Sequence, residues 1–414
     1  MTFRQAEEYL LGLELFGMRF GLDRMHRLMT VLGLPQRRFA SIHVVGSNGK
    51  SSTVRFIAAI LERHGLRTGS YTSPHLRSFR ERIEVGETPI SEADFAAAVE
   101  RAAHAAELVD RTAEPDDRVT QFEALTAAAY HALARRGVEV AVIEAGLGGR
   151  YDATNVIPSK VQVLTGVSLE HTRWLGPTLA DIAGEKLAVV PDQGTLVTGA
   201  LDPESLAVAE RVARVRHAQL IAAQAAPAEL SLRAAGGFQR TNFALAAAAA
   251  EAFLGRPLDP AGREAAAAET LVPGRLEVVT ERPLTVLDGA HNPSGARALA
   301  ESLDSVLGER RPRVAVIGVL DDKDAAGMLE ALLPRVDRII FTRSQNPRSL
   351  SPATLTTLEE KLGGPPAETV ADPLAALARA RELAGPDGSV LATGSIYLIA
   401  DLVREHADAR ASSL

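Results

Sequence analysis

The sequence predicts an α/β protein of two domains, each built on a mostly parallel sheet. Its 414 residues are more than one hydrophobic core usually serves. From residue 41 onward, short β-branched runs alternate with long helical patterns, as they do in repeated βαβ units. The Pro-Gly break at 272–275 interrupts this alternation once, and a second alternation follows it. We therefore expect domains of residues 1–274 and 275–414, the second being the smaller.

The elements can be placed in chain order. In the first domain, apolar runs predict strands at 42–45, 138–143 and 161–167. Helical patterns accompany them at 51–64, 178–189, 239–254 and 260–270. Thr120 and Glu123 have the spacing of a capping box, which predicts a helix start. In the second domain, strands are expected at 284–287, 314–319, 338–341 and 390–392, with helices between them.

Composition excludes several classes of function. The net charge is −7, and no block of Lys or Arg stands out, which argues against a general nucleic-acid or membrane surface. Cysteine is absent, so disulfides, zinc-thiolate sites and thiol nucleophiles are excluded. The first residues are too acidic for a signal peptide, and no apolar run approaches the roughly 18 residues of a membrane span. We expect a cytoplasmic monomer.

The strongest local signal is the segment GSNGKSST at 46–53, which lies between a predicted strand and a predicted helix. Glycines let successive N–H groups point at phosphate oxygens, the helix N-terminus adds partial positive charge, and Lys50 adds a full charge. Two residues separate the glycines, where the standard loop has four. The alternative is a simple turn with a surface lysine. The flanking strand and helix favour a phosphate loop with contacts from Asn48, Gly49, Lys50, Ser51 and Ser52.

Other residues carry weaker signals. Glu144 ends a predicted strand, where a carboxylate facing a phosphate loop is the expected Mg²⁺ anchor; a surface ion pair is the alternative. His171 follows another strand, but a hard cation seldom takes imidazole, so chemistry alone indicates a loop histidine. Ser73 alone would be a turn residue before Pro74, and Lys186 alone a solvated helix lysine.

The loop resembles the nucleotide loop of the Mur ligase superfamily, in particular its folylpolyglutamate synthase and dihydrofolate synthase branch. The other motifs that carry this resemblance span nearly the whole chain in order: YTSPHL at 71–76, ERI at 81–83, TQFE at 120–123, EAGLGGR at 144–150, DATN at 152–155, EHT at 170–172, EK at 185–186, RLE at 275–277, LDGAHNP at 287–293 and TGS at 393–395. Two positions depart from the family pattern. Ser51 stands where Gly is common, and Glu170 stands where Asp usually precedes the histidine.

The resemblance implies a P-loop NTPase-like parallel-sheet ATPase domain followed by a smaller Rossmann-like domain. It implies Mg²⁺ ligands at Ser73 and His171 beside Glu144, and a carbamylated lysine at Lys186. It further implies that ATP is held by Asn242, Arg275 and Asp288, and that His291 touches phosphate or substrate. The expected catalytic residues are Lys50, Lys186 and His291.

The resemblance also implies the reaction. A carboxylate attacks the γ-phosphate of ATP, and the amine of L-glutamate then attacks the acyl phosphate. The expected acceptor is a reduced folate and also dihydropteroate, bound by Thr120, Gln121, Phe122 and Glu123 together with Arg150 and Asp152. For Thr120 and Glu123 the capping box is a sufficient structural explanation by itself. The expected cofactors are ATP and Mg²⁺, with K⁺ as a candidate activator.

Two other readings remain open at this point. Another Mur-type ligase would join an amino acid to a non-folate carboxylate, and a UDP-sugar-binding domain of about 100 residues would be expected ahead of the loop. Only 45 residues precede Gly46, which counts against it. A non-catalytic phosphate-loop protein would be expected to lack strand-end acids, yet Glu144 and Asp288 are both present.

Overall fold

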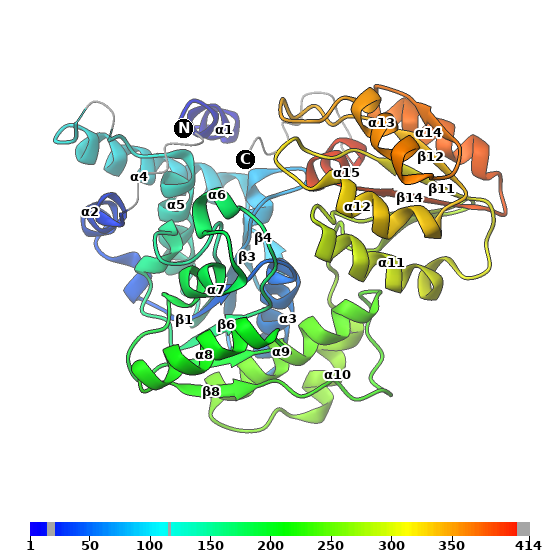
Figure 1. Cartoon of the computed structure of the whole chain (residues 1–414). Helices are drawn as coiled ribbons and strands as arrows, with labels where there is room; N and C mark the ends of the chain where they lie inside the picture. The colour runs from blue at the N-terminus through cyan, green and yellow to red at the C-terminus, as the bar shows by residue number, and fades with distance from the viewer. Residues whose placement is uncertain (15–20, 115–116, 404–414) are drawn as a thin grey trace.

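The computed structural model of the protein describes residues 1–14, 21–114 and 117–403. Two sheets organise these residues, one built from strands between 40 and 222 and one from strands between 277 and 393. Figure 1 shows the corresponding halves, the first coloured blue to green and the second yellow to red. The predicted α/β class is confirmed. The boundary at 274/275 stays a prediction, and residues 404–414, assigned to the second domain, lie outside the described residues.

The first sheet has eight strands in the order β4-β3-β2-β5-β1-β6-β7-β8. They are β1 (Ala40–Val45), β2 (Thr68–Tyr71), β3 (Ile83–Val85), β4 (Thr88–Pro89), β5 (Val140–Glu144), β6 (Val161–Leu164), β7 (Thr195–Thr198) and β8 (Gln219–Ala222). All pairings are parallel except those of β3 with β2 and β4. The carboxyl ends of β5, β1 and β6 are therefore neighbours, and ligands of such sheets bind at this edge.

Helices cover both faces of this sheet because the strands are apolar on both sides. The helices are α1 (Phe3–Leu11), α2 (Asp23–Val31), α3 (Lys50–Arg63), α4 (Glu92–Asp110), α5 (Gln121–Arg135), α6 (Thr172–Leu175), α7 (Leu179–Leu187), α8 (Pro203–Val215), α9 (Gly237–Leu254) and α10 (Pro260–Glu269). Helices α1, α2, α4 and α5 share one core, and α3, α9 and α10 share another. Short 3₁₀ turns at Pro35–Arg37, Phe79–Arg82 and Ala153–Val156 connect some of these elements.

The second sheet has six strands in the order β13-β12-β11-β14-β10-β9. They are β9 (Glu277–Glu281), β10 (Leu284–Leu287), β11 (Arg313–Ile317), β12 (Arg338–Phe341), β13 (Ala367–Thr369) and β14 (Ser389–Thr393). Only β9 is antiparallel to its neighbour. The helices are α11 (Pro293–Leu307), α12 (Ala325–Leu332), α13 (Pro352–Leu362), α14 (Pro373–Ala384) and α15 (Ile396–Val403), with a 3₁₀ turn at Leu333–Arg335. Cores lie on both faces of this sheet.

The strand expected at 161–167 ends early, at Leu164. The hydroxyl of Thr165 donates to the carbonyl of Asn48 at 2.6 Å, and the next residues leave the sheet toward the phosphate loop. This early exit brings the segment 165–171 against the end of β1. Within the described part of the chain, no helix has both the length and the apolar character needed to cross a membrane.

Candidate functional site

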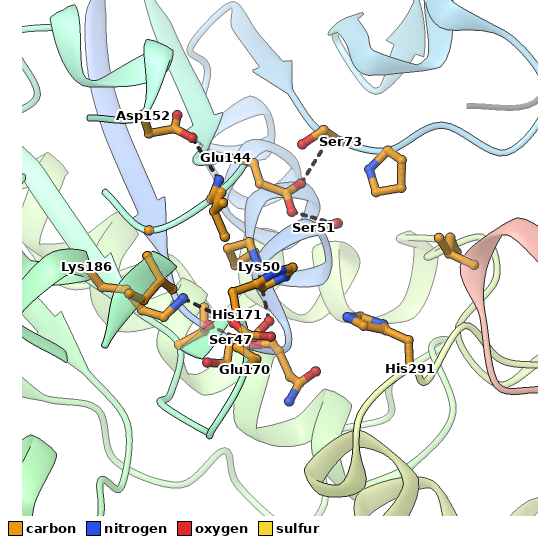
Figure 2. A pocket seen from close by; sticks show the side chains of 18 of the residues that line it. Ser47, Lys50, Ser51, Ser73, Glu144, Asp152, Glu170, His171, Lys186 and His291 are labelled. Carbon is orange, nitrogen blue, oxygen red and sulfur yellow. Dashed lines mark hydrogen bonds and ion pairs between the residues drawn. The ribbon is translucent and has the colours of Figure 1, made fainter. Parts of the chain in front are cut away.

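A cavity of about 930 Å³ lies between the two halves, at the carboxyl ends of the strands of both sheets. Most of the predicted site residues line it: Asn48, Gly49, Lys50, Ser51, Ser52, Ser73, Thr120, Phe122, Glu123, Glu144, Asp152, His171, Lys186, Asn242, Arg275, Asp288 and His291. Two predicted substrate residues, Gln121 and Arg150, are not among the lining residues. Figure 2 shows Lys186 and His291 on opposite sides of the cavity.

The phosphate loop passes very close to α9 at Gly49. Gly49 adopts φ = 84°, and a Cβ there would lie 2.4 Å from Oδ1 of Asn242 on α9. Only glycine fits this conformation beside this neighbour. The ammonium of Lys50 donates to the carbonyls of Gly46, at 3.0 Å, and Ser47, at 3.3 Å. The loop and the candidate nucleotide residue Asn242 are thus in direct contact, as the sequence interpretation requires.

Glu144 lies at the carboxyl end of β5 with only 2% of its surface exposed. It accepts hydrogen bonds from the hydroxyl of Ser51, at 3.0 Å, and from the backbone N–H of Ser73, at 3.1 Å (Figure 2). Burial raises the pKa of Glu144, while Lys50 and these two donors oppose that rise.

These oxygen donors suit Mg²⁺ in kind. Among the described residues, no group of three or more His, Asp and Glu side chains is arranged to hold a metal. Mg²⁺ is usually held by one or two carboxylates together with substrate phosphates and water. One buried carboxylate with serine hydroxyls beside a phosphate loop therefore fits the ion.

Lys186, on α7, is 1% exposed, so the solvated-lysine alternative is wrong. Its ammonium donates to the carbonyl of Gly46 at 2.9 Å and pairs with Glu170 at 3.2 Å. Burial lowers the pKa of Lys186 to about 8, against the opposing charge of Glu170. Burial acts against ionisation of Glu170, but Lys186 and Lys50 lower its pKa to about 2. Both side chains are therefore charged at pH 7, next to the phosphate loop.

His171 lies between the two halves. It adopts φ = 48° directly before α6, and its Nε2 lies 3.5 Å from the ammonium of Lys323 in the second half. Burial and the charge of Lys323 lower the pKa of His171 to about 4. The imidazole is neutral at pH 7, the state that a metal ligand needs.

The second half contributes a strand-end acid from β10. Asp288 accepts hydrogen bonds from the backbone N–H groups of Leu276, at 2.9 Å, and Ala290, at 2.8 Å. A Cβ at Gly289 would lie 2.1 Å from the guanidinium of Arg275, so this arginine lies over the turn. The Nδ1–H of His291 donates to the carbonyl of Gly289 at 3.0 Å. Burial lowers the pKa of His291 to about 4, so it is neutral at pH 7.

An amide pair joins the two halves beside the phosphate loop. The side-chain NH₂ of Asn48 donates to Asn292 at 3.2 Å, and the NH₂ of Asn292 donates back at 3.1 Å. Asn292 also lies 3.4 Å from the second carboxylate oxygen of Glu170. Sequence reasoning missed Asn292 and Lys323 as site residues. Asn292 could have been found, because it belongs to the quoted LDGAHNP motif.

Thr120 and Glu123 also line the cavity, and they form the predicted capping box of α5. Both carboxylate oxygens of Glu123 also accept hydrogen bonds from Nε of Arg24, at 3.0 Å. This carboxylate therefore has a structural role. Phe122 faces the Gly-rich turn after β5, where a Cβ at Gly146 would lie 2.6 Å from its ring. Asp152 is buried and accepts from the N–H of Leu147 at 2.8 Å.

The two predicted substrate residues outside the lining have structural partners instead. The amide of Gln121 donates to the carbonyl of Leu10 at 2.8 Å, which ties α5 to α1. Arg150 forms an exposed ion pair with Glu185 at 2.9 Å. Because neither side chain lines the cavity, we do not assign either of them a substrate contact.

Residues 274–396 match the family described as "Mur ligase, glutamate ligase domain". Together with the fold and the phosphate loop, this match defines an ATP-dependent ligase of the Mur type. The dihydrofolate synthase/folylpolyglutamate synthase of Mycobacterium tuberculosis is 36% identical over 83% of this chain and 78% of its own length. That of Bacillus subtilis is 33% identical over 97% of this chain and 98% of its own. The chain belongs to the dihydrofolate synthase/folylpolyglutamate synthase family, which confirms the resemblance.

Solved structures agree. The structure titled "Mycobacterium tuberculosis Folylpolyglutamate synthase complexed with ADP" superposes with a TM-score of 0.90 at 33% identity, over 96% of each chain. That of "E.coli FolC in complex with DHPP and ADP" gives 0.85 at 28% identity, over 97% of this chain and 96% of that one. A Haloferax volcanii relative, 35% identical, is named a probable bifunctional folylpolyglutamate synthase/dihydropteroate synthase, and the chain spans 50% of its length.

Proposed function

We propose that this protein joins L-glutamate to both dihydropteroate and reduced folates, with ATP and Mg²⁺. The observation that carries this proposal is the chemical asymmetry of the cavity. The cavity lining includes the apolar side chains of Phe122 and Leu147, the phosphate loop, and the cationic side chains of Lys323 and Arg348. A flat pteroyl group suits the apolar side chains, and the two carboxylates of glutamate suit the cationic ones. The E. coli relative solved with DHPP and ADP supports the first part.

The reaction runs in two steps. An oxygen of the acceptor carboxylate attacks the γ-phosphorus of ATP, the bond to the bridging oxygen breaks, and ADP leaves. The neutral amine of glutamate then attacks the acyl carbon, the bond to phosphate breaks, and one amine proton is lost as the amide forms. Phosphoryl transfer asks the protein mainly for positioning and charge neutralisation. We assign the positioning of the nucleotide to Asn242, Arg275 and Asp288, and the neutralisation of phosphate charge to Lys50.

Domains of residues 1–274 and 275–414 would each contribute one wall of the cavity. Excluding water from an acyl phosphate between these walls favours amide formation over hydrolysis. Contacts that cross the cleft, such as Asn48 with Asn292 and His171 with Lys323, support this role for the interface. His291, neutral and on the far wall, is assigned a contact with the transferred phosphate or the substrate.

We further propose that Ser73, Glu144 and His171 hold Mg²⁺, which neutralises phosphate charge when bound. Replacing Glu144 by glutamine keeps the shape but removes the only charge of this ligand set. We expect the Mg²⁺ concentration that gives half-maximal activity to rise by about tenfold to a hundredfold. The measurement is the initial rate of ligation across a magnesium titration.

The matched control for this titration is Glu210→Gln on the exposed surface of α8. Its magnesium titration should overlay that of the unmodified protein. An unchanged titration for Glu144→Gln would make Glu144 a purely structural residue.

The choice of acceptor is tested directly. Purified protein is incubated with ATP, Mg²⁺ and radiolabelled L-glutamate, with dihydropteroate in one reaction and tetrahydrofolate monoglutamate in another. We expect label to enter product in both, because the two acceptors share the pteroyl group that we assign to the apolar side chains of the cavity lining.

Two results would change this assignment. Incorporation with tetrahydrofolate alone would make the protein a dedicated polyglutamate synthase. Incorporation with neither acceptor, with ADP release stimulated by a different carboxylate, would contradict the proposal for both.

A further inference from the structure

Asn292 directly follows His291 and is 3% exposed, yet it does not line the cavity. Its neighbours in space do line it: Asn48, Glu170 and Gly295. The side-chain oxygen of Asn292 accepts a hydrogen bond from the backbone N–H of Gly295 at 2.8 Å, so this residue caps α11. A side chain that lies behind the cavity wall, and contacts three residues of that wall, acts on the site through them.

The side-chain amide of Asn292 takes part in four hydrogen bonds. Its oxygen accepts from Gly295 and from the NH₂ of Asn48, and its nitrogen donates to Oδ1 of Asn48 and to Glu170. An asparagine side chain has two N–H donors and two lone pairs on oxygen, so this set uses its whole capacity. The N–H of Gly295 needs an acceptor and the carboxylate of Glu170 needs a donor. Both needs are met at position 292 only by an amide.

These contacts belong to a closed ring around the start of the phosphate loop. Lys186 donates to the carbonyl of Gly46 and pairs with Glu170 (Figure 2). Glu170 is bound to Asn292, and Asn292 is bound to Asn48, which lies two residues after Gly46. Four members of the ring belong to the first half of the chain, and Asn292 is its member from the second half. The ring therefore fixes the segment that carries Asn292 relative to the loop.

The first turn of α11 packs against the loop at the same place. A Cβ at Gly295 would lie 3.5 Å from Oδ1 of Asn48 and 3.2 Å from Oδ1 of Asn292. The backbone carbonyl of Asn48 accepts from the hydroxyl of Thr165 at 2.6 Å. Asn48 is therefore held through its backbone by the first half and through its side chain by the second.

We propose that Asn292 is a positioning residue that sets the register between the phosphate loop and the turn of residues 288–292. The loop carries Lys50, and the turn carries Asp288 and His291. This register therefore decides whether groups from the two halves meet the same bound nucleotide. The inference rests on the proposed function, because its effect is measured through ligation of the acceptor. It assigns to Asn292 itself no contact with ATP or acceptor.

Asn292→Asp separates this role from helix capping. Aspartate caps a helix as well as asparagine does, so the bond from Gly295 should remain and the melting temperature should stay within a few degrees of wild type. The new side chain cannot donate, and its carboxylate would face that of Glu170. We expect the kcat of ligation to fall by about tenfold or more. A folded variant with wild-type kcat would overturn the proposal.

Asn292→Ser tests the same role without added charge. Its single hydroxyl can cap α11 but cannot also exchange two hydrogen bonds with Asn48, so kcat should again fall by about tenfold. A loss in Asn292→Asp alone would mean that the added charge is responsible, and would overturn the proposal. The matched control is Asp372→Asn, which exchanges a carboxylate for an amide at the exposed N-cap of α14 and should keep wild-type kcat.

Two further readouts distinguish a lost register from general damage. In an Asn48→Ala background, Asn292→Ser should lower kcat by less than about threefold, because the contact with Asn48 is already absent. Equal losses in the two backgrounds would contradict the proposal. The KM for glutamate should stay within about threefold of wild type, since the ring includes neither Lys323 nor Arg348. A KM for glutamate raised by tenfold would show damage throughout the second half, and would also overturn it.

The outcomes separate this register from the function beneath it. If the unmodified protein ligates glutamate to both acceptors and the Asn292 variants do so at the wild-type rate, the register is wrong and the proposed function stands. If the unmodified protein ligates neither acceptor, the proposed function fails and the register fails with it.

Discussion

Replacing Lys50 by alanine is expected to lower kcat by about a hundredfold to a thousandfold, the usual cost of removing one group that stabilises transition-state charge. The ammonium is the mobile full charge of the phosphate loop, and its hydrogen-bond partners among the described residues are the carbonyls of Gly46 and Ser47. Phosphate oxygens can replace those carbonyls as its partners when ATP binds. The measurement is ADP release under saturating substrates.

The fold should survive this change. The loop backbone is held by other contacts, among them Thr165 to the carbonyl of Asn48 at 2.6 Å, so the melting temperature should stay within a few degrees of the unmodified value. Lys361→Ala, on the exposed surface of α13, is the matched control and should retain full activity. Near wild-type ligation by Lys50→Ala would remove the phosphate-loop interpretation.

The second large effect is expected at Lys186. Carbamylation requires the neutral amine: its lone pair attacks the carbon of CO₂, a proton leaves, and a carbamate anion forms. With a pKa of about 8, roughly a tenth of the amine is neutral at pH 7, and about half at pH 8. We therefore expect carbamylation to increase from pH 7 to pH 8 at constant CO₂. Mass analysis of gently handled protein should show one added CO₂ that is lost on acidification.

In related enzymes, by the resemblance, the carbamate of the matching lysine helps to hold the metal or the acyl phosphate. If Lys186 has this role, Lys186→Ala should lower kcat by about a hundredfold or more. Small carboxylic acids that enter the vacated space should partly restore the rate. Glu170 is the natural complication, since a carbamate beside this carboxylate requires a cation between them. Protein that stays unmodified at every pH, and a variant that no carboxylic acid rescues, would leave Lys186 as the ammonium paired with Glu170.

Much of this site could be predicted because several of its residues lie at, or directly after, the carboxyl ends of predicted strands. A Gly-rich loop after β1 and an acid at the end of β5 must meet at one sheet edge, so Lys50 and Glu144 needed no tertiary information. The burial of Lys186 could not be predicted, since it depends on how α7 packs against the carbonyl of Gly46. Lys323 was missed for the same reason, because its neighbour His171 is 152 positions away in sequence.

The starts of two helices also show what the sequence could predict and what it could not. Thr120 with Glu123 closes a full capping box, but Ser91 with Asp94 closes only half of one. The shorter carboxylate of Asp94 meets the hydroxyl of Ser91 at 2.5 Å in place of the backbone N–H. Likewise, Gln121 is part of a family motif, yet its place in the first turn of α5 directs its amide to α1. The sequence patterns predicted where these helices begin, but they did not predict which groups the side chains contact.

The reciprocal amide pair of Asn48 and Asn292 has a consequence for how the cleft opens and shuts. A carboxamide is its own complement, donating and accepting at once, so the hydrogen bonds between Asn48 and Asn292 join two uncharged groups, although Asn292 also lies 3.4 Å from the Glu170 carboxylate. The strength of this pair does not change with acidity and is little affected by ionic strength. Separating Asn48 from Asn292 would therefore break two hydrogen bonds between neutral groups, and not an ion pair.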